Sequence, residues 1–277
     1  MKSLRTLLIL LVCFGLAPLM WAQVDFAPSF VFIDENSGVD NVFVSNNSQE
    51  AYEISIDFAF GYPDSDAEGN LVMNYEDSGA YAIHALDEMI RAFPRSFVLQ
   101  GGEQRTVRIQ VLPNQRRKEG AFFTRMKVLA QPQAREVTET VVEEGIGTRI
   151  TFNFEQVTAV FYHKGRVSTG VEIKGVDVRQ NEGVLELRPH LLRSGNAPFL
   201  GSMYARLKDK NGRVLAETQS TTTVYFDEIR RIDLDLEGVE TGSYELELSF
   251  ETKRNDMMAS DLVQAARVVH VQEVRVN

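Results

Sequence analysis

The chain has 277 residues, a formal net charge of −10 and a single cysteine. The negative charge argues against nucleic acid and against anionic membrane surfaces as partners. The length suits two domains of ordinary size better than one.

The first residues predict where the protein works. Two basic residues precede an apolar run over residues 7–16, and Ala22 offers a small residue at a plausible cleavage point. This order is typical of a secretory signal peptide, which we expect to occupy residues 1–22. A membrane span is the alternative, but the run is shorter than the roughly 20 apolar residues that a bilayer needs. Lipidation at Cys13 is a second alternative, which the preceding Val12 disfavours.

Removal of residues 1–22 would also remove Cys13, the only cysteine. Disulfides then cannot stabilise the mature chain, which must rely on packed cores. We expect no membrane span in the mature chain, because no later segment approaches the necessary apolar length.

The first half of the chain is predicted to form short strands. Turn-forming residues separate apolar or alternating segments at residues 30–33, 41–44, 52–60, 97–99, 106–111 and 122–129. Strands at this spacing predict a β-sandwich. Residues 78–93 are the exception, because apolar residues recur there at roughly helical spacing after Ser78. This pattern predicts a short helix or an irregular crossover.

Residues 131–147 are polar and acidic, and we expect a long exposed loop there. An alternating segment follows at residues 150–162, and its large apolar residues change phase partway along. Such a change indicates either a bulge or a strand shared between two surfaces. Residues 164–170 are short, basic and turn-rich, which predicts a linker.

The second half predicts a second sandwich of the fibronectin-like or immunoglobulin-like kind. Its expected strands lie at residues 184–192, 203–207, 229–236, 245–250 and 263–276, and residues 208–212 give a hairpin signal. We therefore predict an all-β protein with two immunoglobulin-like β-sandwich domains in tandem, at residues 23–164 and 165–277.

Patterns typical of catalysis or metal binding are missing from the sequence. The histidines are scattered, and none stands in a metal-ligand spacing or beside a nucleophile motif. Asp64, Asp66 and Glu68 copy the first half of a calcium loop, but Tyr75 occupies the position that requires a bidentate glutamate. An acidic hairpin turn is the favoured interpretation. We expect neither a cofactor nor enzyme activity.

Residues 90–128 carry a resemblance to a known family. Their order is a proline, an apolar strand, a glycine turn, Gln104 and Arg108 in one strand, a basic loop and a further strand. This order resembles the N-terminal domain of the PapD-like periplasmic chaperones of pilus assembly. Asn46 ends a Val-Ser-Asn sequence that matches the family's Ile-Ser-Asn, and Phe161 and Tyr162 match its closing Phe-Tyr pair.

The resemblance implies a periplasmic chaperone that acts in pilus assembly and cell wall organization. Its partners would be pilin-like β-sandwich subunits, and an outer-membrane usher is a further implied partner. The family's donor strand aligns with Ile150, Phe152 and Phe154, and such a strand completes a client sandwich that lacks one strand. The alternative is that these residues face the core of their own domain. Arg108 matches an arginine whose usual role in the family is a structural ion pair.

The sequence departs from the family at the carboxylate anchor. Family members hold the client's terminal carboxylate with an arginine on the first strand and a lysine on the donor strand. The first strand has no basic residue here, and Ala159 stands in the place of the lysine. Arg149, His163 and Lys164 are the candidate substitutes for a cationic anchor. The alternative function is that of an exported structural or adhesive β-sandwich protein of the cell envelope.

Overall fold

The computed structural model describes residues 24–112, 114–133 and 152–277. The predicted signal peptide lies outside the described residues. Strands dominate the described chain, and the helix α2 (Ser78–His84) is far shorter than a bilayer span. No helix in the described part of the chain could cross a membrane. The prediction of an all-β fold is confirmed.

The first sandwich consists of two sheets. One sheet has the strand order β1-β3-β9-β7 and the other has the order β2-β11-β10-β4-β8. The strands are β1 (Val24–Ala27), β2 (Phe30–Asp34), β3 (Val39–Asn46), β4 (Tyr52–Ala59), β7 (Ile90–Phe93), β8 (Ser96–Leu99), β9 (Gln104–Val111), β10 (Gly120–Pro132) and β11 (Phe154–Lys164).

Alternation of side chains along the strands builds the first core. In β9, Val107, Ile109 and Val111 are buried whereas Arg108 is exposed. Successive side chains of a strand point to opposite faces, so the apolar residues of this run share the inner face. The predicted alternation of this segment is confirmed. A short helix is confirmed within the segment 78–93, but it ends at His84, and Asp77 caps its start.

The chain changes sheets near its beginning. β1 pairs antiparallel with β3 in one sheet, and β2 pairs parallel with β11 in the other. Pro28 lies between the two strands and has no N–H group for either sheet to satisfy. Because β2 begins at Phe30, it covers only the part of β11 from Ala159 to His163.

The second sandwich also has two sheets. One has the order β12-β13-β16, with β17 pairing β13 as well, and the other has the order β15-β14-β18-β19. The strands are β12 (Thr169–Asn181), β13 (Val184–Gly195), β14 (Phe199–Lys208), β15 (Val214–Val224), β16 (Asp227–Ile229), β17 (Ile232–Asp235), β18 (Gly242–Glu251) and β19 (Val268–Val276). The predicted hairpin turn lies between β14 and β15.

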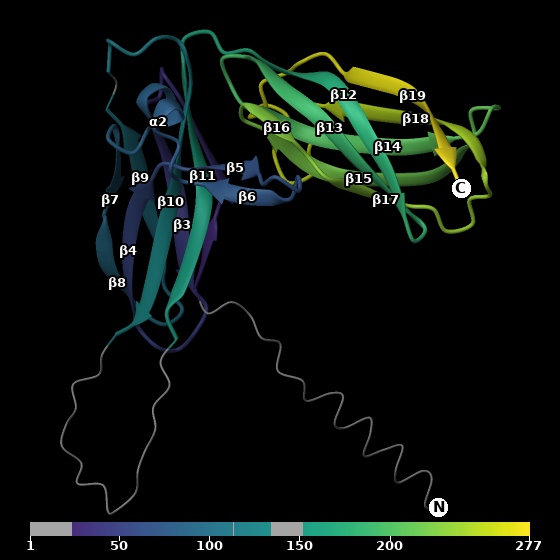
Figure 1. Ribbon diagram of the computed structural model, residues 1–277. Coiled ribbons are helices and arrows are strands. Elements are labelled where there is room, and N and C mark those ends of the chain that lie inside the picture. Colours follow the sequence, from purple (N-terminus) through teal and green to yellow (C-terminus); the bar gives the residue numbers. More distant parts are fainter. Residues whose placement is uncertain (1–23, 113, 134–151) are drawn as a thin grey trace, which may run out of the picture.

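The two sandwiches meet like the arms of an L (Figure 1). A buried apolar cluster joins them, and Tyr225 of the second sandwich lies at its centre. The ring of Tyr225 lies 4.8 Å from that of Phe123 and 5.5 Å from that of Tyr62 between centroids. Aromatic rings at these distances add specific contacts to the burial of apolar area. The cluster therefore holds the two sandwiches in one arrangement.

A small hairpin of β5 (Tyr62–Ser65) and β6 (Leu71–Asn74) bridges the same junction. At its tip, the Arg231 N–H donates to the Gly69 carbonyl at 2.7 Å, and the Arg188 guanidinium donates to the Ala67 carbonyl at 2.6 Å. The Asp66 carboxylate accepts N–H groups within the turn. The predicted acidic hairpin turn is confirmed, and the described residues hold no metal-ligating cluster.

Candidate functional site

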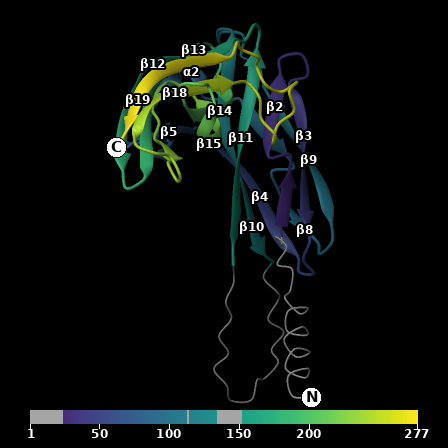
Figure 2. The same ribbon diagram turned by 90° about the vertical axis from the view of Figure 1, so that its right-hand side faces the viewer.

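The edge of β11 is the first part of the candidate site. β10 pairs with β11 along the whole strand, whereas β2 pairs with it only from Ala159 onwards. Residues 154–157 therefore have a described neighbour strand on one side only. Figure 2 shows β11 running from the lower end of the first sandwich up to the junction with the second. An edge strand presents unpaired N–H and C=O groups on which another chain can pair.

An apolar cavity of about 220 Å³ opens beside this edge, at the seam between β1 and β11. Its apolar lining residues are Val24, Phe26, Val128, Ala130 and Phe154. Several of these side chains belong to the core of the first sandwich. A strand added to the edge would place alternate side chains over the seam, where they would meet apolar surface.

The structure separates the three predicted donor residues. Phe154 is the first residue of β11, packs against the first core, and has its ring centroid 6.2 Å from that of Tyr52. Phe152 precedes the strand and is 65% exposed. Ile150 lies outside the described residues. The strand expected from residue 150 thus begins at Phe154, whose register partner Ala130 is the last residue of β10 that pairs with β11.

The upper part of β11 explains the change of phase in the sequence. Val160 and Tyr162 belong to the first core, whereas Ala159 and Phe161 face the second sandwich and are buried in the junction. The register between β10 and β11 runs without a shift. The interpretation as a bulge is therefore wrong for this pairing, and the strand is shared between two surfaces.

A cavity of about 270 Å³ lies in the cleft between the sandwiches. Apolar residues and three guanidinium groups line it together, among them Phe30, Leu71, Met73, Phe161, Leu200, Arg125, Arg230 and Arg254. Arg230 is paired with Glu228 and Arg254 with Asp256, each at 2.6 Å between nitrogen and oxygen. Each of these two cations therefore has a carboxyl partner within the protein.

Arg125 differs from its neighbours in the cleft. Its Nε donates to the Gly61 carbonyl at 3.2 Å, and none of the carboxylates in the described chain lies within ion-pair distance of it. Arg125 stands directly opposite Ala159 in the register of β10 and β11. A guanidinium thus lies beside the position where the resembled family has a lysine. In the sequence, the feature that could have pointed to Arg125 is a basic residue within the apolar strand that precedes the donor strand.

Two of the three candidate anchors predicted from the sequence, His163 and Lys164, lie elsewhere. Lys164 Nζ donates to the carbonyls of Asn114 and Arg117, at 2.9 and 2.8 Å. Burial lowers the pKa of His163, and the nearby Asp34 opposes that shift. Neither side chain lines the cleft cavity. Arg149 lies outside the described residues.

Arg108 was predicted to form a structural ion pair. Its side chain is exposed on β9, where its register partners are Asn41 on β3 and Phe93 on β7. No carboxylate among the described residues pairs with it. The structural ion pair that the resemblance implies for Arg108 stays a prediction.

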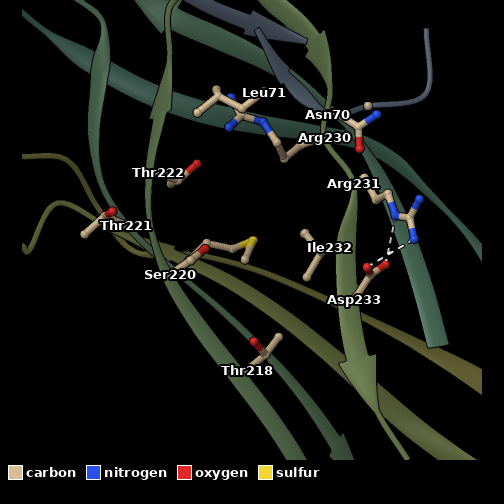
Figure 3. Close-up of a pocket in the computed structure, with 12 residues that line it drawn as sticks. Asn70, Leu71, Thr218, Ser220, Thr221, Thr222, Arg230, Arg231, Ile232 and Asp233 are labelled. Carbon is tan, nitrogen blue, oxygen red and sulfur yellow. Dashed lines mark hydrogen bonds and ion pairs between the residues drawn. The ribbon is translucent and has the colours of Figure 1, made fainter. Parts of the chain in front are cut away.

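A third cavity, of about 410 Å³, lies next to the cleft, between the hairpin tip and the second sandwich (Figure 3). Arg231 forms hydrogen bonds with Asp233 at its rim, and hydroxyl groups of β15 line the opposite wall. Arg230 lies between this cavity and the cleft, beside the buried Glu228. Burial raises the pKa of Glu228 to about 7, although the charge of Arg230 opposes this. The junction therefore contains a carboxyl group that titrates near neutral pH.

No family model matches the sequence, and no curated protein matches it. Solved structures of chaperones are similar to it along most of their length. The YadV chaperone has 9% identity and a TM-score of 0.44, covering 92% of this chain and 100% of that chain. The Acinetobacter baumannii CsuC–CsuE chaperone–tip adhesion subunit pre-assembly complex has 12% identity and a TM-score of 0.46, covering 90% of this chain and 98% of that chain. The E. coli chaperone DraB has 10% identity and a TM-score of 0.43, covering 92% of this chain and 95% of that chain.

Proposed function

We propose that this protein is a periplasmic chaperone of pilus assembly that binds β-sandwich subunits lacking one strand. The observation that carries the proposal is the edge at residues 154–157, which has no partner strand on its outer side among the described residues and lies beside an apolar seam. A client strand would pair with this edge through main-chain hydrogen bonds, while side chains before and along it would fill the client's own groove. The resemblance of residues 90–128, together with Asn46, Phe161 and Tyr162, to the PapD-like family supports the same function.

In this proposal the donor segment comprises Ile150, Phe152 and the exposed edge that follows, whereas Phe154 also supports its own core. Phe152 is available to a client because it is exposed ahead of the strand. The proposal includes a signal peptide that ends at residue 22 and a boundary between the two domains at residue 164. It also includes an outer-membrane usher as a further partner.

Arg125 is the proposed anchor for the client's terminal carboxylate. It is a half-buried cation in a partly apolar cleft, and a carboxylate would give it the ion pair that the described residues do not provide. An Arg–carboxylate pair can form two parallel hydrogen bonds, which fixes orientation as well as adding affinity.

Peptide binding tests the proposal. The probe is a fluorescent ten-residue peptide of alternating valine and threonine with a free carboxylate, and binding to the mature protein is followed by anisotropy. We expect the protein to bind this peptide, and to bind a version methylated on alternate backbone nitrogens at least tenfold more weakly. We also expect the wild type to prefer the free acid over a peptide with an amidated C-terminus, and R125Q to lose that preference.

Two exposed phenylalanines provide a matched pair of variants. F152S should weaken binding about tenfold, because it removes an apolar contact at the donor segment. F43S alters an exposed residue on β3, in the other sheet, and should bind as the wild type does. Equal binding of the methylated and unmethylated peptides would sink the strand-pairing proposal and favour the structural or adhesive role. Mass spectrometry of the N-terminus of protein from the periplasm tests export.

A further inference from the structure

The hairpin of β5 and β6 has two faces with different surroundings. Its register pairs Tyr62 with Asn74 and Asp64 with Val72, so these residues share one face, and Leu71 and Met73 lie on the other. The ring of Tyr62 stacks on Tyr225 and meets Phe226 edge-on, which attaches the first face to the second sandwich. The second face lines the cleft cavity.

The cleft face of this hairpin is apolar and exposed. Leu71 is 60% exposed and Met73 is 42% exposed. β6 pairs only with β5 in this two-stranded sheet, so its outer edge has no partner strand in the described chain. Contiguous exposed apolar side chains that border a cavity are a feature of binding surfaces. The unbranched side chain of methionine can adapt to ligands of different shape.

The remaining lining of the cavity indicates what a ligand beside the hairpin would contact. Phe30, Phe161 and Leu200 supply apolar surface there, and Arg125 supplies a positive charge without a described carboxylate partner. A ligand that contacts the apolar surface and also pairs with Arg125 has an apolar side chain next to a carboxylate. A volume of about 270 Å³ is below the usual range for a complete small-molecule ligand, which suits a single side chain.

We propose that Leu71 and Met73 form a subsite for the terminal apolar side chain of the bound client chain, whose carboxylate lies beside Arg125. This inference rests on the proposed function and adds a selectivity to it, for clients that end in an aromatic or large aliphatic residue. The cavity also includes Ala159 of β11, so it continues from the strand that carries the free edge.

The wall that carries these residues is held in place before the client arrives. The hydrogen bonds from Arg231 and Arg188 fix the hairpin tip to the second sandwich. At Gly69, where φ is +83°, an added Cβ would lie 2.8 Å from the Arg231 nitrogen, so the tip and the second sandwich are in close contact. A rigid wall loses little conformational freedom on binding, which favours affinity.

The experiment compares two probes on the full mature chain. Both are the fluorescent valine–threonine peptide with a free carboxylate, and one ends in phenylalanine while the other ends in serine. We expect the wild type to bind the phenylalanine peptide about tenfold more tightly than the serine peptide. Partial burial of one aromatic side chain would give a difference of this size. The L71S/M73S variant should lose that preference and keep its affinity for the serine peptide.

Val72 provides the matched control. It is 40% exposed on the same strand but faces the opposite way. V72S should therefore keep the tenfold preference. A preference that survives in L71S/M73S, or that V72S also abolishes, would overturn the assignment of this wall while leaving strand pairing intact. Failure of the wild type to bind either peptide would instead remove the proposed function and this inference with it.

A second copy of the chain is the competing occupant of the apolar wall. Sedimentation velocity at increasing protein concentration should show a monomer for both the wild type and L71S/M73S. A wild-type dimer that L71S/M73S abolishes would assign Leu71 and Met73 to self-association and overturn the client subsite.

Discussion

Between Ala159 and Tyr162, β11 has a strand on each side and a buried cluster on each face. Between Phe154 and Val157, by contrast, the described residues give it one neighbour strand, and the seam beside it is open. Both halves pair with β10 in one unbroken register, so the difference does not arise from β11 itself. It arises because β2 begins only at Phe30, so that none of the strands in the described part of the chain covers the lower edge.

Because of this difference, the two halves of β11 are expected to have different roles. The upper half contributes to both the core of the first sandwich and the junction, so changes there should affect folding. The lower half resembles the exposed edge strands that most proteins shorten, charge or cover to prevent pairing. Val157 remains 43% exposed in it. Changes in the lower half should therefore affect partner binding more than folding.

The largest expected effect is at Phe161 in the upper half. This residue is 1% exposed, and its ring centroid lies 5.1 Å from that of Phe32 and 6.4 Å from that of Tyr225. Phe161→Ala should lower the free energy of unfolding by about 3 to 5 kcal/mol, because it leaves a cavity in a packed cluster. Urea denaturation measures this. Val157→Ala is the control, with an expected loss below about 1 kcal/mol, and an equal loss in both variants would contradict the contrast between the halves.

The next effect concerns Glu228, in the junction that the upper half helps to form. Its pKa of about 7 in the folded protein exceeds the ordinary value of 4.5, so the folded state binds the proton more tightly. Protonation of Glu228 therefore stabilises the folded state, and this contribution to the free energy of unfolding is fully present below about pH 4.5 and is lost as pH rises towards 7. Between pH 5 and pH 8 the wild type should lose about 2 to 3 kcal/mol more stability than E228Q.

Urea denaturation of both proteins at the two pH values tests this. His84, also in the junction, has a pKa lowered by burial, so its contribution is lost as pH falls below the ordinary value of 6.5. That effect has the opposite sign and is common to the wild type and E228Q, so it cancels in their comparison. Parallel pH profiles for the two proteins would show that Glu228 is ionised throughout.

Phe154 lies at the lower end of β11, at the boundary between core and free edge. It is half-buried against Tyr52 and the first core. Phe154→Ala should cost about 1 to 2 kcal/mol of unfolding free energy, less than a fully buried phenylalanine, because part of the ring already faces water. Thermal and urea unfolding measure it. A loss as large as that of Phe161→Ala would place Phe154 fully in the core.

The strands that build the two cores were predictable from local alternation, as the burial of Val107, Ile109 and Val111 shows. β12 and β15 were missed. β15 carries Thr and Ser in place of a clear apolar alternation, because it lies at the edge of its sheet. Residues that face the cleft were less predictable. Arg125 lies on β10, whereas the anchor residues of the resembled family lie on the first strand and the donor strand. Only strand pairing brings Arg125 opposite Ala159.

The smallest expected effect on folding is at Phe152, two residues before Phe154. Periodicity places the two phenylalanines on one face of one strand, yet the strand begins at Phe154, and Phe152 is 65% exposed ahead of it. Phe152→Ala should therefore change the unfolding free energy by no more than about 0.5 kcal/mol. Binding of the valine–threonine peptide should weaken severalfold in the same variant, whereas Phe154→Ala should affect stability first. Measured together by urea denaturation and anisotropy, the two variants separate donor from core. A stable Phe152→Ala that binds the peptide as tightly as the wild type would confine the partner site to the edge of β11.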